Sequence, residues 1–249
     1  MYITNMNLGQ YVPTGSFIHR LDPRAKLFSL FLIISAIFPS KTSLGVLLWS
    51  IVLAALVTAS KVSWRSVLNS VKPIFFLALF TFFFNAAFNG IHIAVFTSLR
   101  LVLLIMFAVM LPLTTAPLEL ADGINELLRP LERFHFPADE CAMMIGMALR
   151  FIPLLMEETD KIIRAQLSRG ATLDQGNIFR RAKAFFPVLI PLLIIIFRRA
   201  DEIATAMEAR GYDGGKGRTR RKPLHWGIYD TLAVIVSAAW VGMFLALRL

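Results

Sequence analysis

The sequence has little cysteine, little histidine and few acidic residues. A single cysteine, Cys141, excludes a disulfide framework and a cysteine-based metal site. The four histidines lie far apart without ligand spacing, so the sequence predicts no metal ion at all. Only 16 acidic residues oppose 26 Lys and Arg, for a net charge of +10. A basic excess of this kind is typical of proteins that contact nucleic acid, an anionic membrane surface or an acidic protein.

The motifs of common enzymes are also missing. The glycines of Gly211–Thr219 have the wrong spacing for a phosphate-binding loop, and neither H-E-x-x-H nor G-x-S-x-G occurs. Glu157, Glu158 and Asp160 stand beside basic residues and are interpreted as a solvated, salt-bridged helix face. Motifs for base stacking are absent as well. We therefore expect a protein that is not an enzyme, needs no cofactor and binds no nucleic acid.

Apolar residues, in contrast, make up 57% of the chain, above the roughly 45–50% of soluble domains. A helix needs about 20 apolar residues to cross a bilayer core. Runs of suitable composition predict five membrane spans: Leu27–Ser40, Ser43–Ser60, Pro73–Phe88, Ile93–Leu113 and Thr231–Leu247. The first run is short, but Lys26 and Lys41 extend it if they snorkel. Arg100 lies inside a span; such an arginine is a functional candidate, although its position favours snorkelling to the outer interface.

One more apolar run, Ala184–Phe197, competes for a place in the membrane. It has 14 residues and two prolines, which favours a buried or surface-lying helix. Charge supports this interpretation, because cytoplasmic loops carry an excess of Lys and Arg. With five spans and the N-terminus inside, 23 of the 26 basic residues are cytoplasmic, whereas Lys41 and Arg248 are outside. A crossing at this run would place the eight basic residues from Arg198 to Lys222 outside.

The predicted fold is therefore an all-α polytopic membrane protein. It has about five transmembrane helices and a cytoplasmic helical region inserted before the last one. We expect a membrane part over residues 1–113, cytoplasmic coupling helices over 114–222 and a C-terminal span over 223–249, with the C-terminus extracytoplasmic. Within the cytoplasmic region, the patterns predict helical stretches at Pro117–Phe134, with a break near Pro130, at Pro137–Gly170 and at Asn177–Gly211.

Two of these stretches end in the same phrase. DKIIRAQLSRG (Asp160–Gly170) and DEIATAMEARG (Asp201–Gly211) share Asp, Ile, Ala, Arg and Gly in one register, 41 positions apart. One interpretation is helix capping, with Arg at the negative end of the dipole and Gly just past the helix. The alternative is a pair of equivalent tips that bind a two-fold partner. In that case the contact residues are Arg169 and Arg210, the small shoulders Ala165, Ser168, Ala206 and Ala209, and the terminal Gly170 and Gly211.

Several segments carry a resemblance to a known family. HRLDPRAKL (from His19), PLTTAPLELADGINELLRPL (from Pro112), ALRFIPLLMEETDKIIRAQLSRG and AMEARGY resemble the transmembrane T component of energy-coupling factor (ECF) transporters, a class of ABC importers. Nearly the whole chain matches in order. The family signature near the N-terminus falls on Asp22, Pro23, Arg24 and Lys26. The family's Ala-Arg-Gly tripeptide is present at residues 209–211, but Ser168 replaces the alanine at the first site.

The resemblance implies a scaffold that couples two cytosolic ABC ATPase subunits to a substrate-binding membrane S component in a bacterial cell membrane. Arg169 and Arg210 are expected to enter equivalent grooves on the ATPases, and the apolar helix faces to form a platform for the S component. The substrate, a vitamin or a metal ion, is held by the S component. The Met-rich stretch Cys141–Met147 fits either such a platform or an ordinary core.

An integral membrane enzyme would need clustered His, Asp or Cys, and a permease several polar intramembrane segments; the sequence favours neither.

Overall fold

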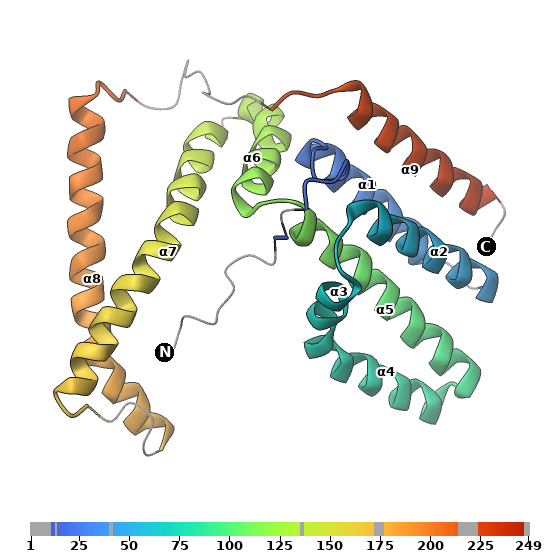
Figure 1. Ribbon diagram of the computed structural model, residues 1–249, viewed down its shortest axis with the longest axis horizontal. Helices are drawn as coiled ribbons and strands as arrows, with labels where there is room; N and C mark the ends of the chain where they lie inside the picture. Colours follow the sequence, from blue (N-terminus) through green and yellow to red (C-terminus); the bar gives the residue numbers. More distant parts are fainter. Residues whose placement is uncertain are drawn as a thin grey trace. The chain divides into compact units, whose positions relative to one another are not determined.

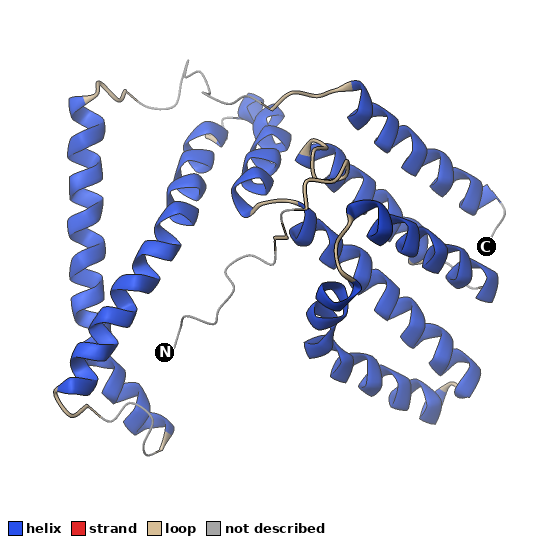
Figure 2. Cartoon of the chain, in the orientation of Figure 1, coloured by secondary structure: helices blue, strands red, loops and turns tan. Residues whose placement is uncertain are grey.

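The computed structural model describes residues 11–12, 14–39, 42–134, 137–171, 177–213 and 224–246. In these ranges every regular element is a helix (Figures 1 and 2). The elements run in this order: α1 (Pro23–Ile37), α2 (Ser43–Ser60), α3 (Trp64–Val71), η1 (Lys72–Ile74), α4 (Phe75–Phe88), α5 (Ile91–Thr114), α6 (Pro117–Leu128), η2 (Arg129–Phe134), α7 (Ala138–Ser168), α8 (Ile178–Ala209) and α9 (Ile228–Ala246). The predicted all-α fold class is confirmed.

Three of the described helices are long and apolar enough to cross a membrane. They are α2, α5 and α9, and α3 with α4 makes a fourth candidate that is bent by 60°. The bend follows from Pro73 in η1, which has no backbone N–H to continue a regular helix. Since α1 has only 15 residues, its crossing stays a prediction. The chain is thus an all-α polytopic membrane protein, and α8, which contains Ala184–Phe197, is not among the candidate spans.

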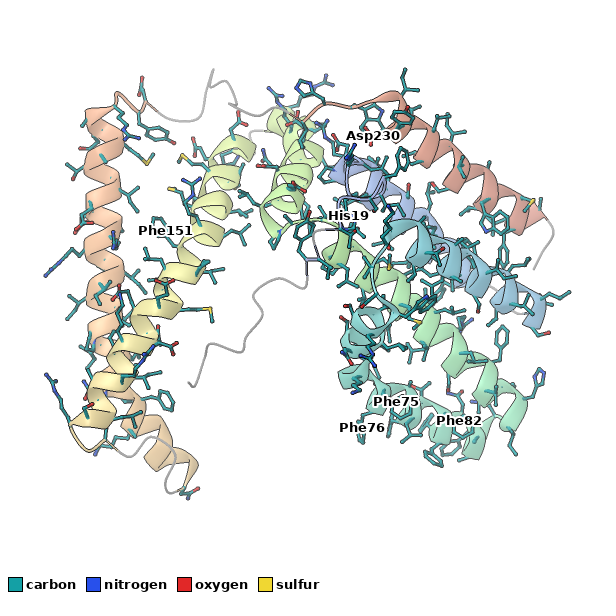
Figure 3. All side chains as sticks on the ribbon, viewed as in Figure 1. His19, Phe75, Phe76, Phe82, Phe151 and Asp230 are labelled. Carbon is teal, nitrogen blue, oxygen red and sulfur yellow. The ribbon has the colours of Figure 1, made fainter. Side chains whose placement is uncertain are left out.

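The helices form two compact units: α1 to α6 with α9, and η2 with α7 and α8. The core of the first unit surrounds Trp49 of α2, whose side chain is fully buried. Its ring lies 6.0 Å from Phe107 of α5 and 5.2 Å from Phe244 of α9, measured between centroids. In contrast, Phe75 and Phe76 at the start of α4 are exposed (Figure 3). This unit therefore presents apolar side chains outward, as a lipid-facing surface requires.

Polar side chains fasten the start of α1 to two other helices of the first unit. Asp22 caps α1 by accepting from the Arg24 N–H at 2.9 Å. The Asp22 N–H donates to Asp230 Oδ1 of α9 at 2.7 Å. Buried Lys26 Nζ donates to the Thr114 carbonyl at the end of α5 at 3.0 Å and to Thr115 Oγ1 at 3.1 Å. The first turn of α1 is therefore the point where α1, α5 and α9 are joined.

Arg100 of α5 has a structural partner at the opposite end of α1. One of its guanidinium nitrogens donates to the Phe38 carbonyl at 2.9 Å, and the group lies 5.7 Å from the Phe38 ring centroid. Phe38 is the C-cap of α1, so the positive charge meets the negative end of that helix. In the predicted topology this is the outer end of α1, which agrees with the snorkelling interpretation.

Candidate functional site

The two helices that carry the repeated phrase lie in the second unit. They pack where the last part of α7 meets the first part of α8: Ile163 and Val188 are buried against each other, with Ile162 and Ala184 beside them. Gln166 Nε2 of α7 also donates to the Pro187 carbonyl at 3.3 Å. That carbonyl lacks its usual helical donor, because the residue four positions later is Pro191, which has no N–H. This contact fixes α7 and α8 to each other through their apolar and amide side chains.

The tip of α7 ends in a left-handed glycine. Gly170 has a φ of +86°, and its N–H donates to the Leu167 carbonyl at 2.9 Å. The Ala171 N–H reaches back to the Gln166 carbonyl at 3.0 Å. This pair of bonds is the Schellman motif, which satisfies the last carbonyls of a helix.

The tip of α8 has the same backbone structure. Gly211 has a φ of +71°, and its N–H donates to the Glu208 carbonyl at 2.9 Å. The Tyr212 N–H donates to the Met207 carbonyl at 3.0 Å. The predicted glycine caps are thus confirmed at both ends, and the two Schellman bonds are the same at both tips.

Both arginines of the phrase are exposed in this structure. The small residues in front of them, Ala165 and Ser168 on α7 and Ala206 and Ala209 on α8, are exposed as well. Each arginine therefore follows small side chains on the helix surface. Of these, Ser168 Oγ donates to the Arg164 carbonyl at 3.0 Å and so has its own partner. The structure brings together every member of each predicted tip: Ala165, Ser168, Arg169 and Gly170 on α7, and Ala206, Ala209, Arg210 and Gly211 on α8. Their binding role stays a prediction.

A cleft of about 710 Å³ adjoins the α8 tip. Its walls come from the first half of α7 and the last turns of α8, and they include Arg150 and Arg210. Phe151 of α7 lies on the same wall (Figure 3). The sequence does not predict a role for Arg150, because its position 60 residues before Arg210 carries no sign of proximity. Only the folding of α7 against α8 reveals the pair.

The family signature lies in the other unit. Asp22 and Pro23 are buried at the start of α1, Lys26 is buried one turn later, and the Arg24 side chain stays partly exposed. Asp230 is not predicted from the sequence either, although an acid at the start of an apolar run is a visible signal. Within the ranges that the structure describes, no group of three His, Cys, Asp or Glu residues is placed to hold a metal ion.

Comparison with known proteins gives a consistent result. Residues 14–221 match the family described as cobalt transport protein, CbiQ. A protein of Thermanaerovibrio acidaminovorans named energy-coupling factor transporter transmembrane protein EcfT is 46% identical over 255 residues, which cover 96% of this chain and 95% of the relative. Proteins of the same name from Ruminiclostridium cellulolyticum (45%, covering 96% of this chain and 97% of the relative) and Bacillus subtilis (39%, covering 98% of each) are also similar.

Proposed function

Because the chain belongs to the family of energy-coupling factor transporter transmembrane proteins, we propose that it is the scaffold that transmits ATP hydrolysis to a substrate-binding subunit. Two cytosolic ABC ATPase subunits bind its cytoplasmic helices, residues 114–222, and a membrane S component binds the substrate. The chain itself performs no catalysis in this proposal. It resides in a bacterial cell membrane with the N-terminus and the coupling helices in the cytoplasm.

One observation carries this proposal: the two helix tips are the same structure twice. ABC ATPases act as pairs, and a two-fold pair needs two equivalent contact points on a single chain. Arg169 and Arg210 supply them, since each guanidinium is exposed next to a glycine cap with the same pair of Schellman bonds. A guanidinium forms planar, bidentate bonds to carboxylates. Acidic grooves on the ATPases are therefore the expected binding sites.

The apolar surface of α8 supports a second contact, with the S component. In the middle of this helix a continuous set of large apolar side chains is exposed: Phe185, Phe186, Leu189, Ile190, Leu193, Ile194 and Phe197. An exposed patch of this kind marks a protein or membrane contact. Met144, Ile145 and Ile152 of α7 are exposed as well. These faces of α7 and α8 form the platform of the proposal.

Charge reversal at the tips tests the coupling role. Arg169→Glu and Arg210→Glu should each weaken ATPase binding, since loss of one charge-assisted contact costs about 1.5–3 kcal/mol and the reversed charge repels an acidic groove. The double substitution should abolish uptake. The measurement is retention of the two ATPases on the tagged chain in detergent, with vitamin uptake in cells that contain the S component.

The yield of extracted protein is the control for folding. A helix-dipole role alone would cost at most about 1 kcal/mol per site and leave partner binding intact. A well-expressed double mutant that keeps both ATPases and transports normally would show that the arginines only cap their helices, and the proposal would fail.

A further inference from the structure

The 41-residue offset of the phrase aligns α7 with α8, so each position on one helix has a counterpart on the other. This register allows the two tips to be compared beyond their caps. Next to the α7 tip the helices are in close contact, because Ile163 packs on Val188 and both are buried. Ile162 and Ala184 complete this apolar seal.

The corresponding contact next to the α8 tip is open. The counterparts of Ile163 and Val188 are Ala204 and Met147. Ala204 has a methyl group where Ile163 has a branched side chain of four carbons, and Ala204 is exposed. Met147 therefore lines the cleft of about 710 Å³ instead of a seal, together with Met143, the counterpart of Ala184. Methionine side chains are flexible and adapt to the shape of a partner.

The open cleft beside the α8 tip also has an excess of positive charge in its lining. Two guanidinium groups, Arg150 and Arg210, line it, against the single carboxylate of Asp213. Within the described part of the chain, neither guanidinium has a salt bridge or a side-chain hydrogen bond. The counterpart of Arg150 in α8 is Pro191. Arg150 thus adds to the α8 tip a guanidinium from the neighbouring helix, at a position where α8 offers the α7 tip only a proline.

We propose that the cleft beside the α8 tip binds an acidic, amphipathic segment of one ATPase subunit, with carboxylates on both Arg150 and Arg210 and apolar side chains among the methionines. This inference rests on the proposed function and deepens it. The charge of the cleft selects an acidic occupant, and its apolar walls select a segment with one apolar face. Arg150 is then a specificity-determining residue, and the two tips hold the ATPases unequally although their caps are the same.

The test is a set of charge reversals in the complete transporter, with the affinity of each purified ATPase for the detergent-solubilised chain as the measurement. Arg150→Glu should lower the affinity at one of the two ATPase sites roughly 10- to 100-fold, the loss of one charge-assisted contact. Arg150→Gln should give a smaller loss. Arg198→Glu is the matched control, since Arg198 is exposed on α8 and does not line the cleft.

Double substitutions distinguish a shared binding segment from a general effect of charge. Arg150→Glu and Arg210→Glu should be non-additive, because residues that contact one partner segment are coupled. Arg150→Glu and Arg169→Glu should be additive, because they act at different tips. A photo-crosslinker at position 147 should attach to an ATPase segment that contains Asp or Glu.

The outcomes separate this inference from the function on which it rests. If Arg150→Glu binds both ATPases as the unchanged chain does, while Arg210→Glu does not, the cleft has no acidic ATPase segment and the coupling role of the tips stands. The inference is also overturned if Arg150→Glu changes only the amount of anionic lipid that copurifies with the chain. It fails as well if Arg150→Glu is coupled as strongly to Arg169→Glu as to Arg210→Glu. If the Arg169→Glu, Arg210→Glu double mutant retains both ATPases and transports normally, the proposed function itself is wrong.

Discussion

The arginine and the glycine of each tip have separate roles. All the capping bonds at the α7 tip are made by backbone N–H groups, with Gly170 in the left-handed region that side chains with a Cβ rarely adopt. The Arg169 side chain takes no part in them. The same holds for Gly211 and Arg210 at the α8 tip. Charge reversal at either arginine therefore leaves the bonds of the cap in place, so a loss of ATPase binding would not result from loss of the cap.

Glycine has a different role at position 123, in α6. An added Cβ there would lie 2.8 Å from the Cβ of Pro23, an atom of a rigid ring in the first turn of α1. We expect Gly123→Ala to destabilise the chain by about 1–3 kcal/mol, the usual cost of overpacking. The measurement is the thermal midpoint of the purified protein in detergent.

Gly242 in α9 is the matched control, because an added Cβ would meet nothing within 4 Å. Gly242→Ala should leave the midpoint unchanged or raise it, since alanine favours a helix by about 1 kcal/mol. Equal midpoints for the two variants would show that the approach of α6 to α1 is not tight in solution.

At this scale the sequence predicts the caps but not the buried polar contacts. Gly170 and Gly211 are identified by a local rule, because a glycine after an amphipathic run ends a helix. From the sequence, Lys26 is a residue of the family signature that extends the first apolar run if it snorkels. In the structure it is buried, and one of its acceptors belongs to Thr114, 88 positions away. No local sequence pattern predicts a hydrogen-bond acceptor so distant along the chain.

Among the elements, the helices of the second unit follow their sequence patterns closely. The predicted stretches Pro137–Gly170 and Asn177–Gly211 correspond to α7 and α8. The predicted break near Pro130 is also present, since α6 ends at Leu128 and η2 follows. The span predicted at Pro73–Phe88 is incomplete in one respect: the short α3 precedes it, and α4 starts only at Phe75. The eight residues of α3 are amphipathic, and an apolar count over a long window overlooks them.

The exposed apolar face of α8 predicts a second measurable effect. Ile190 and Ile194 lie one turn apart and are both about half exposed, at 54% and 55%. Replacing both by Glu should release the S component, because two charges would be buried without partners in an apolar contact. The two ATPases should stay bound. Copurification of each subunit with the tagged chain measures both effects.

Ala200→Glu serves as the control for added charge, since Ala200 is exposed on the same helix beyond the apolar run. It should retain the S component. Retention of the S component by the Ile190, Ile194 double mutant would contradict the platform. A loss of ATPases in that mutant would instead indicate that α8 has unfolded.

For the whole molecule, the distribution of basic residues predicts the topology. Gly215 should be cytoplasmic and the C-terminus extracytoplasmic; both positions lie outside the described residues. Single cysteines placed at Gly215 and after Leu249, in a chain with Cys141→Ser, can be labelled from outside intact cells with a membrane-impermeant maleimide. Only the C-terminal cysteine should react. Labelling at position 215 would show that the run Ala184–Phe197 crosses the membrane and that the five-span topology is wrong.

The assembly of the first unit is the part that the sequence could least predict. Composition and charge identify α2, α5 and α9 as spans, but apolar helices pack equally well in many orders, so hydropathy says nothing about neighbours. The pairing of α9 with α1 includes a bond from the Asp22 N–H to the Asp230 carboxylate and another between the Ser237 and Ser29 hydroxyls, besides the packing of the two helices. Such a partner becomes visible only in three dimensions.

That pairing also sets a delay in the biosynthesis of the protein. Asp22 leaves the ribosome 208 residues before Asp230. At about 5–20 residues per second, the start of α1 waits roughly 10–40 seconds for its partner, while α7 and α8 are being translated. During this interval the face of α1 that α9 will cover lies against lipid or the insertion machinery. A chain halted before Ile228 should therefore remain a substrate for membrane quality-control proteases, however completely its cytoplasmic helices have formed.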